Sequence, residues 1–176
     1  MEKFAFILHP LSLEDMEHLS PLMRYIPNPI IEACLKMKKP FKVSHITGIK
    51  SPYAEAEGWF IGCPLTAKQM VELPEEFVMD RIIESGKVAQ ELGAKIVGLG
   101  AFTSIVGDAG ITVAKNLDIA VTSGNSYTVA TAIQGTKQAA RMMGKDLKEC
   151  RAVVVGATGS IGAASVRLLA KEVKHI

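Results

Sequence analysis

The stretch AVVVGATGSIGAAS, residues 152–165, decides how this chain is interpreted. An apolar run is followed by three glycines, Gly156, Gly159 and Gly162, and then by an amphipathic helical pattern. A buried strand, a glycine-rich turn and a helix in this order form the phosphate-binding element of many nucleotide-binding folds. The spacing is GxxGxxG rather than the commoner GxGxxG, so the turn is one residue longer.

The chemistry of such a turn is electrostatic. The first glycine permits backbone angles that other residues avoid, and the next lets the backbone approach a pyrophosphate. The helix N-terminus adds free N–H groups and a partial positive charge, and Gly162 allows close packing behind it. We therefore predict a cofactor-binding turn made of Gly156, Ala157, Thr158, Gly159, Ser160, Ile161 and Gly162. The alternative is a tight strand-to-helix turn that binds nothing.

Outward from this stretch, strands and helices alternate, which predicts an α/β architecture with mainly parallel strands. We expect strands at 3–8, 41–50, 57–64, 95–99, 118–121 and 151–155, the second and third forming a hairpin. Helices are expected at 12–23, 74–93 and 126–143, with a last one from about residue 159. The predicted domains are an N-terminal α/β substrate domain at 1–125, a connecting helix at 126–144, and an incomplete NAD(P)-binding Rossmann domain at 147–176. The last would supply the first β-α unit of a doubly wound parallel sheet.

Two further segments follow predicted strands, where α/β folds place ligand groups. In the first, Gly100, Thr103 and Ser104 are predicted to contact substrate; an ordinary glycine-rich connection is the alternative. In the second, Thr122, Gly124 and Asn125 are predicted to do the same, although helix capping also explains these residue types. No catalytic residue is predicted, and Cys63 is interpreted as a buried structural cysteine.

Composition excludes several classes of protein. With 20 basic and 18 acidic residues the net charge is +2, which predicts no nucleic-acid partner. No apolar run approaches the ~20 residues of a membrane span, and the scattered cysteines and histidines lack metal-ligand spacing. We therefore expect a cytoplasmic protein without a metal or an integral membrane segment. The short basic run of Lys36, Lys38, Lys39 and Lys42 reads first as a solvated loop.

Three strings carry a family resemblance: LGAFTSIV at 99–106, TSGNSYTVATAI at 122–133 and VVVGATGSIGAASVRLL at 153–169. Together they resemble the long-chain fatty acyl-(acyl carrier protein) reductases, which show similar strings in the same order. The ITG at 46–48 and the CPL at 63–65 are also similar to that family. A wider set of shikimate dehydrogenase-like proteins, described as predicted amino acid dehydrogenases, shares this layout.

The resemblance implies an oxidoreductase that converts an acyl thioester, carried on acyl carrier protein, to a fatty aldehyde with NADP as cofactor. NAD is the alternative, because the residue that reads the adenosine ribose is expected ~20 residues beyond the glycines, near the last residue, Ile176. In that family the nucleophilic cysteine lies in the C-terminal part, and none of Cys34, Cys63 or Cys150 matches it. The family is about twice as long as this sequence, so we expect either a fragment or a degenerate copy.

Two other functions fit the sequence. One is a shikimate- or amino-acid-dehydrogenase-like enzyme acting on a small polar substrate, although no convincing Lys and Asp pair stands out in residues 1–125. The other is a non-catalytic module that binds an acyl group or acyl carrier protein, with the basic run facing that acidic partner. An incomplete Rossmann sheet would also expose a strand edge, and a homodimer that covers it is a hypothesis.

Overall fold

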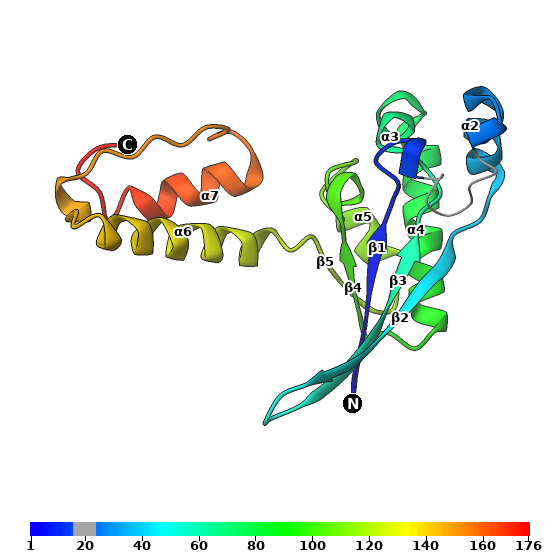
Figure 1. The fold of residues 1–176 in the computed structure, drawn as a ribbon, viewed down its shortest axis with the longest axis horizontal. Helices are drawn as coiled ribbons and strands as arrows, with labels where there is room; N and C mark the ends of the chain where they lie inside the picture. Colours follow the sequence, from blue (N-terminus) through cyan, green and yellow to red (C-terminus); the bar gives the residue numbers. More distant parts are fainter. Residues whose placement is uncertain (16–23) are drawn as a thin grey trace. The chain divides into compact units, whose positions relative to one another are not determined.

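The computed structural model describes residues 1–15 and 24–176 (Figure 1). Contacts between its residues group the chain into two compact units, Met1–Ser123 and Gly124–Ile176. The first unit contains a sheet of five strands in the order β2-β3-β1-β4-β5. The strands are β1 (Glu2–Leu8), β2 (Phe41–Lys50), β3 (Glu55–Gly62), β4 (Ile96–Leu99) and β5 (Ala120–Thr122).

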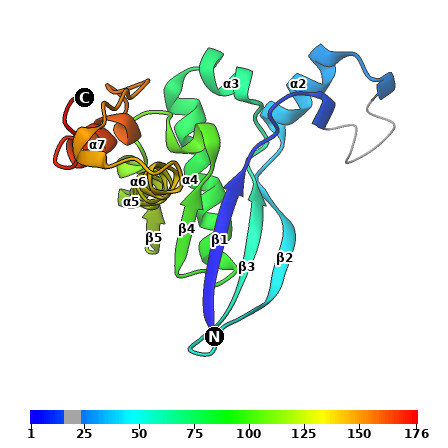
Figure 2. The ribbon, with the colours of Figure 1, turned by 60° about the vertical axis from the view of Figure 1, so that its left-hand side comes forward.

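The sheet is mostly parallel, which confirms the predicted α/β class. Strand β1 lies in the middle and pairs in parallel with β3 on one side and β4 on the other, and β4 pairs in parallel with β5. Strand β2 runs antiparallel to β3, so the predicted hairpin is present. Because β1, β3, β4 and β5 run in one direction, their carboxyl ends meet at the same edge of the sheet (Figure 2).

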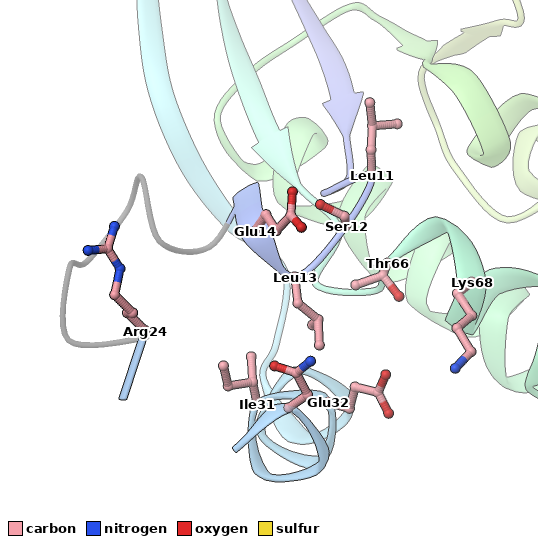
Figure 3. Close-up of a pocket in the computed structure, with 10 residues that line it drawn as sticks. Leu11, Ser12, Leu13, Glu14, Arg24, Ile31, Glu32, Thr66 and Lys68 are labelled. Atoms are coloured by element: carbon pink, nitrogen blue, oxygen red, sulfur yellow. The ribbon is translucent and has the colours of Figure 1, made fainter. Parts of the chain in front are cut away.

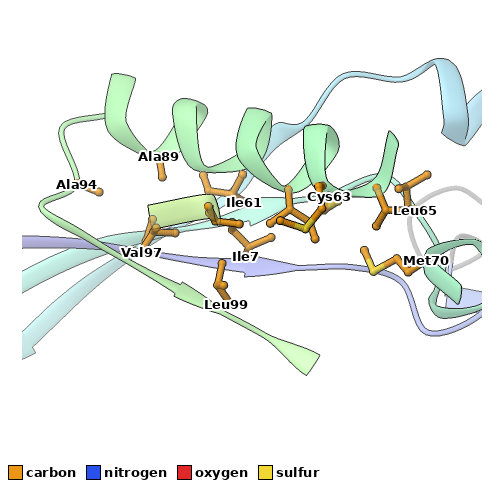
Figure 4. Close-up of a cluster of buried hydrophobic side chains, with 14 of the residues drawn as sticks. Ile7, Ile61, Cys63, Leu65, Met70, Ala89, Ala94, Val97 and Leu99 are labelled. Atoms are coloured by element: carbon orange, nitrogen blue, oxygen red, sulfur yellow. The ribbon is translucent and has the colours of Figure 1, made fainter. Parts of the chain in front are cut away.

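Helix α4 (Glu75–Glu91) covers one face of this sheet, as its predicted apolar stripe requires. Val78, Ile82 and Ala89 are wholly buried on this helix. They pack on strand side chains that include Ile7, Ile61 and Val97, which are also wholly buried (Figure 4). The helix begins after Pro74 and ends before Gly93, whose φ of +85° suits only glycine well. The short helix α5 (Ile111–Lys115) adds Val113 to the same core.

Three helices of the first unit were not predicted: α2 (Asn28–Met37), α3 (Ala67–Glu72) and α5. Helix α2 begins between Pro27 and Pro29; proline often marks a turn, but it is also common in the first turn of a helix. Helix α3 has a complete capping box, in which Thr66 and Gln69 each accept the other's backbone N–H at 3.2 and 3.1 Å.

The predicted helix at 12–23 lies largely outside the described residues. In the part that is described, the Asp15 carboxylate accepts the backbone N–H of Ser12 at 3.1 Å.

The second unit consists of α6 (Asn125–Met142), the 3₁₀ helix η3 (Leu147–Glu149) and α7 (Ser160–Leu169). Helices α6 and α7 lie side by side, and Lys137 of α6 forms an ion pair with Glu172, which follows α7. Their small core contains Val129, Ile133 and Leu169. On α6, Val129, Ile133 and Ala140 are buried at helical spacing, whereas Thr136 and Met143 are exposed.

The prediction of a strand at 151–155 is wrong, because this segment forms no strand in the described structure. Arg151 forms a single parallel bridge with His175, and no ladder continues from it within residues 124–176. The segment still alternates like a strand, because Ala152 and Val154 pack on the small core while Val153 and Val155 are 83% and 94% exposed. A strand needs a hydrogen-bonding neighbour as well as an apolar pattern, and here that neighbour is missing.

Within residues 1–15 and 24–176, none of the helices combines the length and apolar character that crossing a bilayer would require. In the same residues, no group of three His, Cys, Asp or Glu side chains is placed to hold a metal ion.

Candidate functional site

The first candidate site is the carboxyl edge of the sheet, where β1 and β4 end side by side. The chain leaves β1 toward β2 and β3 on one side, and leaves β4 toward β5 on the other. Open α/β sheets bind their ligands at such a switch point, outside the carboxyl ends of the strands. The predicted Gly100, Thr103 and Ser104 follow β4 at this edge, and Thr122 is the last residue of β5.

Glycine at position 100 lets β4 approach β1 closely. A Cβ atom there would lie 2.6 Å from the carbonyl oxygen of Ile7 and 2.7 Å from the ring of Phe6. Ala101 follows with a φ of +47°, a left-handed conformation that costs a non-glycine residue on the order of 1 kcal/mol. Backbone held in such a conformation at a strand end is a feature that binding sites often share.

The two predicted hydroxyls at this edge bond within their own turn. The Thr103 hydroxyl donates to the carbonyl of Gly100 at 2.7 Å and is buried, so it stabilises the 3₁₀ helix η2 (Ala101–Ser104). The Ser104 hydroxyl donates to the carbonyl of Ala101 at 2.7 Å, and Ser104 is half-buried. Of the two, Ser104 is therefore the one that a ligand can reach.

His9, which the sequence did not single out, fixes the position of this turn. Its Nε2 accepts the backbone N–H of Phe102 at 3.2 Å, and its Nδ1 lies 3.0 Å from the carbonyl of Pro10. A carbonyl only accepts, so Nδ1 carries the proton and the imidazole is neutral in this arrangement. The ring also meets that of Phe102 edge to face, 5.9 Å between centroids. The sequence did offer a signal for this role, because His9 is one of four histidines and directly follows the strand predicted at 3–8.

The second candidate site is the glycine turn of the second unit. Gly156 has a φ of +77°, as the tight turn requires. A Cβ atom at Gly162 would lie 2.0 Å from the carbonyl oxygen of Gly156, so only glycine lets the helix pass this close to the turn. Gly159 precedes α7, and no side chain caps the helix. No side chain therefore accepts a capping hydrogen bond from the backbone N–H groups of its first turn.

A second helix begins beside this turn. The side-chain amide of Asn125, the first residue of α6, donates to the Ser160 hydroxyl at 3.0 Å, at the first residue of α7. Gly124 caps α6 with a φ of +74° and offers no side-chain cap. The structure therefore brings predicted cofactor and substrate residues together, at two helix N-termini whose partial positive charges both favour an anion. The assignment of these residues to particular ligands stays a prediction.

Two hollows lie near the carboxyl edge in the first unit. One, of about 450 Å³, is lined by residues of the 11–14 segment, α2 and the start of α3, among them Leu13, Ile31 and Thr66 (Figure 3). The other, of about 200 Å³, is lined mainly by apolar groups and includes His9 and Cys63. Burial raises the pKa of the Cys63 thiol to about 11, against a lowering by its hydrogen bond with Ser85. This thiol is consequently protonated at neutral pH, which fits a structural cysteine.

No protein-family model matches the chain. It is 31% identical over 183 residues to the long-chain acyl-[acyl-carrier-protein] reductase of Synechococcus elongatus, a match that covers 94% of this chain and 51% of that protein. It is also 30% identical over 180 residues to the aminotransferase PigE of Serratia sp., over 95% of this chain and 20% of that protein. The chain thus spans about half of one curated relative and a fifth of the other, and both are named as enzymes.

Proposed function

We propose that this chain supplies the substrate domain and the first nucleotide-binding element of an NADP-dependent oxidoreductase that reduces a fatty acyl thioester to an aldehyde. NADH is the alternative reductant. The single observation that carries the proposal is the pairing, around the 156–162 turn, of two helix N-termini that lack a side-chain cap. The similarity to a reductase over nearly the whole chain supports the acyl thioester as substrate.

The turn fits a dinucleotide in the chemistry of its donors. Gly159 places no side chain at the helix N-terminus, and Gly162 keeps the helix against the turn. The hydroxyls of Thr158 and Ser160 add polar groups beside the free backbone N–H groups. These groups would hold the pyrophosphate of NADPH. The bound cofactor would supply the hydride that reduces the thioester to the aldehyde, with the sulfur leaving as a thiolate.

Gly159 offers a test that separates anion binding from folding. Its φ of −75° and ψ of 164° suit any residue, and its Cβ would make an ordinary contact at 3.4 Å. Asp and Asn both cap helices well, so Gly159→Asp and Gly159→Asn should leave α7 as stable as before or slightly more stable. The Asp carboxylate repels a pyrophosphate, whereas the Asn amide does not.

We expect Gly159→Asp to weaken NADPH binding at least tenfold, and Gly159→Asn to weaken it clearly less. The measurement is a titration that follows NADPH fluorescence, with circular dichroism to check that the helices remain. Equal affinities for the wild type and the Asp variant would remove the turn from the cofactor site. If the wild type binds acyl carrier protein but no NADPH at all, the non-catalytic binding module is the better description.

A further inference from the structure

The sheet face opposite α4 carries an apolar surface of unusual form. Side chains alternate along a strand, so the residues between the core positions of β1, β3 and β4 point away from α4. Phe6, Leu8 and Ile96 on this face remain 38%, 38% and 40% exposed. We call the set the apolar floor; its residues are Phe4, Phe6, Leu8, Phe60 and Ile96.

Glycines alternate with the large side chains across the apolar floor. Phe6 pairs with Phe60 on β3 and with Gly98 on β4, and Phe4 pairs with Gly58. A Cβ at Gly98 would lie 2.5 Å from the Phe6 ring, and a Cβ at Gly58 would lie 2.7 Å from the Phe4 ring. The aromatic rings therefore occupy the space above glycine backbone rather than standing up from the sheet.

The two faces of the sheet are built for different partners. Toward α4, branched side chains such as Ile7 and Ile61 fill the space between sheet and helix. On the apolar floor, the rings of Phe4 and Phe6 lie over glycine backbone, and Leu8 and Ile96 are the exposed branched side chains. A surface of this form gives long contact to a thin, flexible ligand such as an alkyl chain, and offers little for a helix to interdigitate with.

The apolar floor continues into the 200 Å³ hollow at the carboxyl edge. Leu8 belongs to both, and Gly62, Phe41 and Val43 extend the apolar lining. One acidic residue, Asp15, also lines the hollow, and its carboxylate accepts the backbone N–H groups of Leu11 and Ser12 at 2.8 and 3.1 Å.

Positive charge gathers beside this hollow. Lys38 lines it and places its Nζ 4.2 Å from the centre of the Phe41 ring. Lys36 and Lys39 are close to Lys38 along the chain, whereas Lys42 pairs with Ile61 on the face of the sheet that α4 covers. Among the described residues, none of Lys36, Lys38 and Lys39 has an ion-pair partner. The hollow and the lysines thus match an apolar chain presented by an acidic protein.

We infer that the apolar floor binds the acyl chain of a thioester whose acidic carrier protein docks on Lys36, Lys38 and Lys39. The inference rests on the proposed function, which supplies the thioester. It adds the route: the acyl chain enters through the hollow at the carboxyl edge and extends along β1 over the rings that cover the glycines.

The test uses a dye-labelled carrier protein, either loaded with a hexadecanoyl chain or unloaded, in fluorescence anisotropy titrations without NADPH. The double variant Phe6→Thr, Leu8→Thr keeps a strand-forming residue at both positions and removes apolar contact. This variant should reduce the preference for loaded over unloaded carrier about tenfold. The reason is that the lost apolar contacts weaken binding of the acyl chain but not of the carrier protein itself. Ile49→Thr, at an exposed position of β2 outside the apolar floor, is the control and should change nothing.

Charge reversal tests the docking surface separately. Lys38→Glu combined with Lys39→Glu should weaken binding of loaded and unloaded carrier alike, by about tenfold at low salt and less at high salt. Lys87→Glu on α4, also exposed and without an ion pair among the described residues, is the matched control.

The outcomes separate this inference from the proposed function. If both double variants bind loaded carrier as the wild type does, the inference is wrong and the reductase proposal is untouched. If the apolar-floor variant instead changes the mass measured by light scattering, a second copy of the chain covers this face and the inference is again wrong. If the wild type binds no carrier protein, the proposal of an acyl thioester substrate is also wrong. The NADPH titration then still tests the cofactor separately.

Discussion

Strand β4 of the first unit and the 151–155 segment of the second have similar sequence patterns, but only β4 forms a strand in a sheet. Val97 in β4 is wholly buried and paired on both sides, whereas Val153 and Val155 are 83% and 94% exposed. Both stretches are short, apolar and rich in β-branched residues. The difference shows that an apolar pattern becomes a strand only when neighbouring strands supply hydrogen bonds and a helix layer covers the face.

The largest expected difference between the two units comes from truncating one β-branched side chain in each of them. Ile61→Ala should lower the free energy of unfolding of the first unit by about 3 kcal/mol, because it leaves a cavity in a wholly buried site. Val155→Ala should change stability by less than about 0.5 kcal/mol, since its side chain is exposed. Urea unfolding followed by the fluorescence of Trp59, the single tryptophan, and by circular dichroism measures both.

A similar loss for both variants would mean that Val155 is buried in solution, by a partner or by further chain.

The second test compares two glycines inside the second unit. Gly162→Ala should destabilise α7 by about 2 kcal/mol, because its Cβ would lie 2.0 Å from the backbone oxygen of Gly156. Gly135→Ala, in the middle of α6 with open space around it, should stabilise that helix by about 0.5–1 kcal/mol. Hydrogen exchange of the amides of α6 and α7 reads out each effect. A neutral Gly162→Ala would contradict the close approach of turn and helix.

The smallest expected effect is on the pH dependence of the stability of the first unit. The pKa of Cys63 is raised from 9.0 to about 11 in the folded state, so the folded protein keeps this proton longer than the unfolded chain. The stabilisation is complete below pH 9 and is lost as the pH rises through 11, by on the order of 1–2 kcal/mol. Cys63→Ala should remove this part of the alkaline loss, which unfolding curves at pH 8 and pH 10.5 would measure.

Exposed Cys34 serves as the reference for reactivity. It should react with a thiol reagent at pH 8 in the folded protein, whereas Cys63 should not. Rapid modification of Cys63 would show that the sheet edge opens.

Most of the first unit could be predicted because its signals are local. The alternation along β2 and the stripe of Val78, Ile82 and Ala89 on α4 follow directly from strand and helix periods. Helix α2 was missed because proline marks both turns and first helical turns, and the sequence alone does not choose between them.

The candidate site was less accessible, because it depends on which segments meet. The glycine pattern predicts a turn, and the structure shows why Gly162 must be glycine, but the hydrogen bond between Asn125 and Ser160 joins positions 35 residues apart. The role of His9 in holding Phe102 likewise depends on the pairing of β1 with β4, which no local pattern specifies.

The rings that lie over glycines on the open sheet face also constrain how this protein can evolve. Phe6 covers Gly98 and Phe4 covers Gly58, so each pair of positions forms one unit. A side chain gained at the glycine would expel the ring, and a ring lost alone would leave bare backbone. In related sequences we therefore expect positions 6 and 98, and positions 4 and 58, to change together. Such covariation would mark the face as under selection even where the amino acids themselves differ.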